Sequence, residues 1–105
     1  MLKNIINFIK EKFNMINENT EVLILGWPDP FNIHHYGYIH RCALKDSLSK
    51  MENHLNDLNL TEDERLYYQF SVLLEENGKE RLIYTYYGNK KIKVRDEFKD
   101  ILNFD

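Results

Sequence analysis

The residue types best suited to chemistry are concentrated in one segment of this chain. Residues 26–42 hold the only tryptophan, the only cysteine and three of the four histidines, which are Trp27, Cys42, His34, His35 and His40. Imidazole and thiolate groups bind zinc and transfer protons, and indole rings are common anchors at protein interfaces. This segment is therefore the first place to expect a functional site.

A metal or hydrolytic site is one interpretation of the segment. Zinc needs three or four converging ligands, which here would be His34, His35, His40 and Cys42. Adjacent histidines in extended chain point to opposite sides, and the chain has neither a C-x-x-C nor an H-x-x-x-H pair. On a strand, His40 and Cys42 would share one face and place a thiol beside a base, but no third group to orient that base is evident. We predict no cofactor and keep a small metal-binding or hydrolytic protein as an alternative.

Contact with another protein is the interpretation that the segment favours. Trp27, Tyr36 and Tyr38 are aromatic, and Pro28 and Pro30 stiffen the backbone between them. Aromatic side chains dominate the energetics of interfaces and lose little conformational entropy on burial. We expect these three aromatic residues to contact a partner.

Acidic residues form two further groups along the chain, Asp57, Glu62, Asp63 and Glu64, and then Glu75 and Glu76. The chain has 14 basic and 17 acidic residues, so its net charge of −3 gives no overall attraction to nucleic acid or to an anionic membrane. No stretch is apolar for long enough to span a bilayer. Carboxylates speed the encounter with a basic protein, so we expect both groups to belong to a partner-binding surface.

Together these features predict a non-enzymatic protein-binding module. Its most specific version is an immunity protein or inhibitor that neutralises a bacterial toxin, such as a basic nuclease domain, by covering the toxin's active surface. A protein of this kind needs no catalytic residue. One cysteine cannot form an internal disulfide, so the cytoplasm is the expected compartment.

Three helices are predicted to support this surface. Apolar residues at three- and four-residue steps, Leu2, Ile5, Ile6, Ile9, Phe13 and Ile16, predict a helix over 2–17. A second stripe, Leu44, Leu48, Met51, Leu55 and Leu58, predicts a central helix over 43–58. Asp96 is a candidate N-cap for a short last helix that turns Phe98, Ile101 and Leu102 inward.

The remaining elements are predicted to form an antiparallel sheet. An apolar run that ends at Gly26 predicts a strand near 21–26. The pairs Asn77-Gly78 and Gly88-Asn89 are typical of two-residue hairpin turns, which predicts a meander with strands at about 67–76, 79–87 and 90–95. Thr61 and Glu64 have the spacing of a capping box, so a helix over 66–76 stays open as an alternative. The fold class is a single α+β domain over 1–105.

Two-residue turns would also fix which side chains share a face of the meander. They place Val72 opposite Ile83 and Ile83 opposite Val94, on an apolar face with Phe70, Thr85 and Ile92. The opposite face would then collect aromatic and basic residues, which are Tyr84, Tyr86, Lys91, Lys93 and Arg95. Such a face can stack bases and hold phosphates, so a nucleic-acid-binding domain is a further alternative, although the negative net charge disfavours it.

Overall fold

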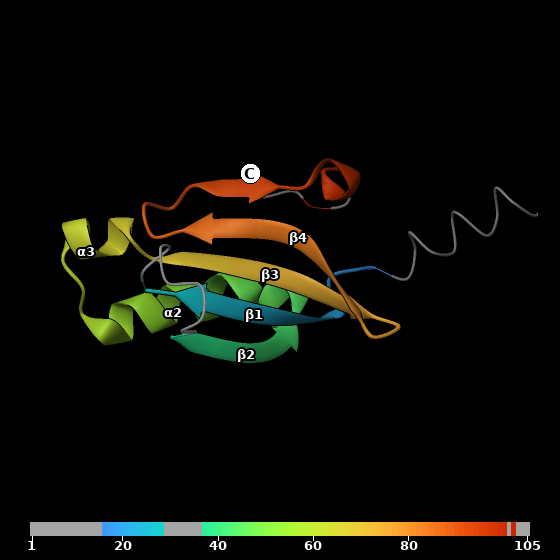
Figure 1. The fold of residues 1–105 in the computed structure, drawn as a ribbon, viewed down its shortest axis with the longest axis horizontal. Coiled ribbons are helices and arrows are strands. Elements are labelled where there is room, and N and C mark those ends of the chain that lie inside the picture. Colours follow the sequence, from blue (N-terminus) through green and yellow to red (C-terminus); the bar gives the residue numbers. More distant parts are fainter. Residues whose placement is uncertain (1–15, 29–36, 101, 103–105) are drawn as a thin grey trace, which may run out of the picture.

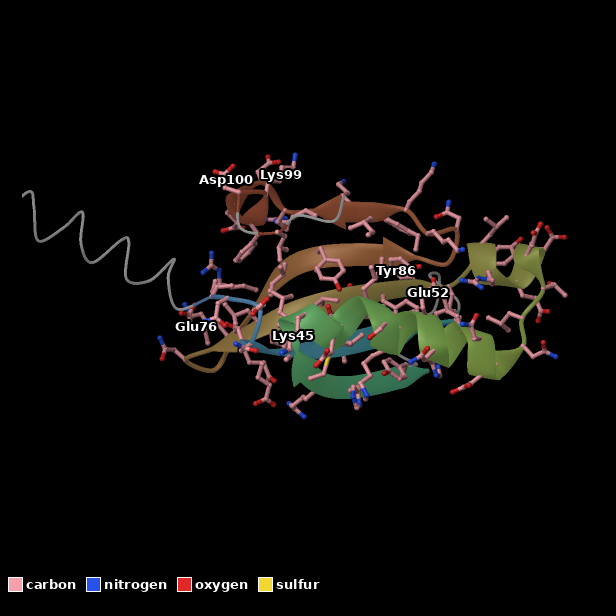
Figure 2. The ribbon with its side chains drawn as sticks, turned by 180° about the vertical axis from the view of Figure 1, so that it is seen from behind. Lys45, Glu52, Glu76, Tyr86, Lys99 and Asp100 are labelled. Atoms are coloured by element: carbon pink, nitrogen blue, oxygen red, sulfur yellow. The ribbon has the colours of Figure 1, made fainter. Side chains whose placement is uncertain are left out.

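A five-stranded antiparallel sheet, backed by one helix, forms the predicted α+β fold (Figure 1). The computed structural model describes residues 16–28, 37–100 and 102. The strand order is β2-β1-β3-β4-β5, and the bounds are Glu21–Trp27 (β1), Tyr38–Ala43 (β2), Gln69–Glu76 (β3), Lys79–Tyr87 (β4) and Ile92–Val94 (β5). Helix α2 (Ser47–Leu58) lies across one face of the sheet, and helix α3 (Glu62–Leu66) lies at one end (Figures 1 and 2).

The core lies between α2 and the sheet. Met51 and Leu55 of α2 are fully buried, as is Ile24 of β1 and the aromatic ring of Phe70 of β3. These α2 residues belong to the predicted apolar stripe, because positions four apart lie on one side of a helix. The two ends of the stripe differ. Leu44 is buried in a 3-10 turn, Leu44–Asp46, that precedes the helix, whereas Leu58 is exposed.

The structure describes only part of the two predicted terminal helices. Most of the helix predicted over 2–17 lies outside the described residues, but residues 17–20 form a turn in which the Thr20 amide donates to the Asn17 carbonyl at 3.0 Å. At the other end the predicted helix is only a 3-10 turn, Asp96–Phe98, in which Arg95 and not Asp96 occupies the N-cap. Phe98 is buried as predicted. The described residues include no helix long and apolar enough to cross a membrane.

The predicted strand is confirmed over residues 69–76, and the alternative of a helix over 66–76 is wrong, although its capping box does begin a short helix. Thr61 and Glu64 form the capping box, and helix α3 begins there, but it ends at Leu66. Strand β3 then begins at Gln69. A capping box satisfies the first amides of a helix without fixing its length, so the signal located the start of α3 and not its end. Strand β2 is an additional element that the sequence pattern did not single out.

The register predicted for β4 is confirmed from Lys79 to Leu82 and wrong beyond Leu82, because β4 contains an extra residue there. Leu73 faces Leu82 but Val72 faces Tyr84, so Ile83 has no partner on β3. The loop after β4 is also longer than predicted: Lys90 has a φ of 72°, and the Lys90 amide donates to the Tyr87 carbonyl at 2.9 Å. The first turn is as predicted, with positive φ at Asn77 and Gly78.

These two shifts turn the aromatic residues of β4 inward. Tyr84 and Tyr86 pair with Val94 and Ile92 of β5, and both tyrosines are buried beneath α2. The Tyr84 hydroxyl is hydrogen-bonded to Ser47 of α2. The predicted face of tyrosine, lysine and arginine is therefore not formed, because its tyrosines belong to the core.

Candidate partner-binding surface

The carboxylates predicted to contact a partner lie at two ends of the sheet. Asp57, Glu62, Asp63 and Glu64 surround α3, whereas Glu75 and Glu76 lie at the far end of β3, beside the β3–β4 hairpin (Figure 2 labels Glu76). Strand β3 runs from one group to the other and, with eight residues at about 3.3 Å per residue, is about 25 Å long. The structure therefore does not bring them into one surface.

The carboxylates at the hairpin end are paired within the chain. Glu75 accepts from Arg41 Nε at 3.0 Å, and Glu76 lies 3.5 Å from Arg81. Arg81 also donates to Glu97 at 2.7 Å, and these carboxylates raise the pKa of its guanidinium. These exposed pairs balance the charge of Glu75 and Glu76, so the hairpin end offers little uncompensated attraction to a basic partner.

Trp27 and Tyr38, the aromatic residues of the 26–42 segment that the structure describes, do not share a surface either. Tyr38 faces Gly26 across the β1–β2 ladder, so Trp27, the next residue on β1, lies on the opposite face of the sheet. The Tyr38 ring packs beneath α2, with its centroid 4.3 Å from that of His54, and burial raises the pKa of its hydroxyl. Trp27 is half-buried, and Tyr36 lies outside the described residues.

Helix α3 is held at its start by its own capping box. The Glu64 amide donates to Thr61 Oγ1 at 3.2 Å, and the Thr61 amide donates to Glu64 Oε1 at 3.1 Å. Glu62 and Asp63 lie in the same first turn, where the positive end of the helix dipole stabilises carboxylates. Glu64 therefore has a structural role, which leaves Glu62 and Asp63 to face solvent.

A second set of contacts clamps α3 onto the rest of the fold through Arg65. Its Nη2 donates to both carboxylate oxygens of Glu52 on α2, at 3.1 and 3.2 Å, and its Nε donates to the Gly88 carbonyl at 3.2 Å. Tyr86 donates its hydroxyl to the same Glu52 carboxylate (Figure 2). The backbones of α3 and of the β4–β5 loop also approach closely, because a Cβ on Gly88 would lie 1.7 Å from the Arg65 carbonyl oxygen.

Apolar side chains are exposed to solvent at the end of the fold where α3 lies. Among the described residues, Leu58, Leu66 and Tyr67 are three of the four large hydrophobic residues that are exposed, at 43%, 59% and 59%. Leu58 and Tyr67 line an open hollow of about 740 Å³, together with Pro28, Gly37, Leu60, Glu64 and Tyr68. Tyr68 is held in place at the base of this hollow, because the residue is buried and the Tyr68 hydroxyl lies 3.0 Å from His54 Nε2.

We use the name α3 surface for the residues that combine exposure with apolar or acidic character at this end, Asp57, Leu58, Glu62, Asp63, Leu66 and Tyr67. The sequence pattern identified its three carboxylates and missed its three apolar members. Leu58 matched the core-facing stripe of α2, and Leu66 and Tyr67 fell in a segment whose helix or strand character stayed open. The capping box is the one signal in the sequence that separates α3 from β3, and it could have identified Leu66 and Tyr67 as surface residues.

The segment considered for metal binding is only partly described. Within residues 16–28, 37–100 and 102, no three His, Cys, Asp or Glu side chains lie close enough to share a metal ion, and His34 and His35 lie outside these ranges. His40 and Cys42 share the α2-facing side of β2, as expected from their spacing. Burial and the nearby Asp46 raise the pKa of the Cys42 thiol, which lowers the fraction present as the nucleophilic thiolate.

The chain matches no protein-family model, and searches of curated proteins and of solved structures return no similar protein.

Proposed function

We propose that this chain is a non-enzymatic protein-binding module that acts in the cytoplasm as an immunity protein or inhibitor of a basic toxin domain. The observation that carries the proposal is the α3 surface, where exposed Leu66 and Tyr67, at the end of the clamped helix α3, and exposed Leu58, at the end of α2, lie at one end of the fold. Exposed apolar residues that gather on a rigid element are typical of protein interaction sites. A partner would bury them without paying for the ordering of a loop.

Charge supports a basic partner rather than an acidic one. Asp57, Glu62 and Asp63 are exposed beside the apolar residues, and the described part of the chain shows no ion pair for any of them. By contrast, Glu75 and Glu76 already face arginines. Lys90 lines a hollow together with Glu62 and Asp63 but forms no ion pair with either, so the α3 surface keeps more net negative charge than the hairpin end. Basic surfaces that bind nucleic-acid phosphates, as in a nuclease, would be complementary to the α3 surface.

The proposal is tested by co-expressing the chain with basic toxin domains, beginning with any toxin-like domain that is encoded beside its gene. The wild-type chain should restore growth and block the toxin's activity in a purified assay. The double variant Glu62→Lys/Asp63→Lys should lose this protection, mainly through slower association, and its defect should grow smaller as salt is added. Glu64 is left intact because it caps α3.

A matched control uses the carboxylates at the other end of the sheet. The variant Glu75→Lys/Glu76→Lys makes the same change in net charge as Glu62→Lys/Asp63→Lys, but 25 Å away by the approximate length of β3. It should still protect. Equal protection by both double variants, or equal loss, would refute the assignment of binding to the α3 surface.

A further inference from the structure

The two edges of the sheet differ in how well they are protected against pairing with another strand. Edge strand β5 has three residues, Ile92–Val94, and Lys91, Lys93 and Arg95 lie along it. Edge strand β2 has six residues and is paired with β1 along its whole length. Short edges that carry lysines resist association, whereas a longer regular edge without lysine or proline does not.

The backbone of β2 has hydrogen-bonding groups that face away from the sheet. The Leu44 amide donates to the Thr20 carbonyl at 2.8 Å, which extends the β1–β2 ladder. Hydrogen-bonded pairs alternate along an antiparallel ladder, so His40 bonds to Ile24 and the N–H and C=O groups of Ile39 and Arg41 point outward. Of the described helices and strands, none lies beyond this edge (Figures 1 and 2).

The side chains along the same edge are apolar or already balanced in charge. Ile39 is 60% exposed, the largest value among the exposed large hydrophobic residues of the described chain. Arg41 lies 3.0 Å from Glu75 of the same chain. A second β2 strand would therefore meet no net charge of its own sign, whereas two β5 edges would bring six basic side chains together.

We propose that β2 pairs with β2 of a second copy of this chain, antiparallel about a two-fold axis, to form one continuous sheet. The register that places His40 opposite His40 of the second copy lets the outward groups of Ile39 bond to those of Arg41 across the axis. Shifting the pairing by two residues toward the end of the strand would place Arg41 opposite Arg41, and like charges in direct opposition are unfavourable. Shifting it the other way would place Ile39 opposite Ile39 but would pair only residues 38–40 of β2. In the first register each Ile39 lies against the aliphatic stem of Arg41, which covers its exposed surface.

The proposal is tested by the mass of the protein in solution across a concentration series. Because few residues pair, we expect a weak dimer, and sedimentation equilibrium up to about 200 μM should show the mass rising from monomer toward dimer. Ile39→Lys should remain a monomer throughout. Leu66→Lys is the matched control, because Leu66 is 59% exposed, and it should dimerise like the wild type. A wild-type monomer at every concentration, or equal loss in both variants, would overturn the proposal.

A cross-link distinguishes this register from other modes of association. In the facing pair at the axis, two Cα atoms are about 4.5 Å apart, within the range that a disulfide spans. His40→Cys in a Cys42→Ser background should therefore form a disulfide-linked dimer under mild oxidation. Lys93→Cys on the opposite edge, in the same background, should stay monomeric. Cross-linking through Lys93→Cys but not through His40→Cys would contradict pairing through β2.

This proposal rests on the β2 edge and is independent of the proposed toxin partner. Ile39→Lys should keep the protection conferred through the α3 surface, and Glu62→Lys/Asp63→Lys should keep the dimer. Failure of one proposal is thus visible without failure of the other.

Discussion

The Arg65 guanidinium and the Glu52 carboxylate join α3 to α2 through two hydrogen bonds of 3.1 and 3.2 Å. Both side chains are mostly buried, with exposed fractions of 20% and 27%. Tyr86 shares the same carboxylate, so one acidic group fixes α2, α3 and β4 together. The exposed residues of the α3 surface depend on this arrangement for their position.

Removing Arg65 should therefore destabilise the protein and disorganise α3. Arg65→Ala leaves the Glu52 carboxylate with one fewer partner, and we expect the free energy of unfolding to fall by about 1.5–3 kcal/mol. The control is Arg41→Ala, which breaks the exposed pair with Glu75 and should cost about 0–1 kcal/mol. Urea denaturation of both variants measures the difference. Equal losses would show that the Arg65 clamp contributes no more than a surface ion pair.

Gly88 should tolerate a methyl group less well than Gly78. A Cβ at residue 88 would lie 1.7 Å from the backbone oxygen of Arg65, so Gly88→Ala must push α3 away from the β4–β5 loop. We expect a loss of about 1–3 kcal/mol or more. A Cβ at residue 78 would meet open space, so Gly78→Ala is disfavoured only by the φ of 75°, which lowers the free energy of unfolding by about 1–2 kcal/mol. A smaller effect at residue 88 than at residue 78, measured by thermal unfolding, would contradict the close approach.

Because Tyr84 and Tyr87 of β4 lie on opposite faces of the sheet, replacing them should lower the free energy of unfolding by different amounts. Tyr84→Ser removes a fully buried ring and should cost about 3–5 kcal/mol. Tyr87→Ser changes a half-buried side chain on the other face and should cost about 1 kcal/mol. The register expected from two-residue turns predicts the reverse order for the meander, since it places Tyr84 at the surface. Chemical denaturation of the two variants decides between the registers.

The register of β4 against its neighbouring strands could be predicted only in part from the sequence pattern. Val72, Ile92 and Val94 were assigned to the correct face, because the extra residue at Ile83 and the longer loop ending at Lys90 offset each other between β3 and β5. Only residues 84–87 of β4, which lie between the two irregularities, have their faces reversed relative to the prediction. The alternation of apolar and polar residues does not reveal a bulge here, because the registers with and without the extra residue both place large side chains in the core.

The candidate site was predictable to a similar extent. Charge made Asp57, Glu62 and Asp63 visible in the sequence, and capping chemistry made the start of α3 visible. The exposure of Leu66 depends on where α3 ends, and that end is set by Arg65 reaching residues 13 and 23 positions away in the chain. Contacts over such separations are not encoded in local periodicity.

Acidification should weaken the fold through His54. Burial against Tyr38 and Tyr68 lowers the pKa of His54 below its ordinary value of 6.5, and Asp57 opposes this shift only in part. The folded state therefore binds the proton less readily than the unfolded state. Stability should be greatest above about pH 6.5, should decline as the pH falls toward the lowered pKa, and should then level off for this group.

The contribution of His54 is isolated by comparing two variants. His54→Gln should flatten the decline in unfolding free energy between about pH 7 and pH 5, whereas His40→Gln should leave it in place. An unchanged pH dependence in His54→Gln would show that the burial of His54 does not contribute to the pH dependence of stability.

The affinity of the purified chain for the proposed toxin partner tests the central claim most directly. Calorimetry should show that Leu66→Ala/Tyr67→Ala binds about 30-fold more weakly than the wild type or worse, which corresponds to the loss of about 2 kcal/mol expected for an interface hot spot. Ile39→Ala, at 60% exposure, is the matched apolar control and should bind like the wild type. An unchanged dissociation constant for the double variant, with its fold confirmed by circular dichroism, would contradict binding through the α3 surface.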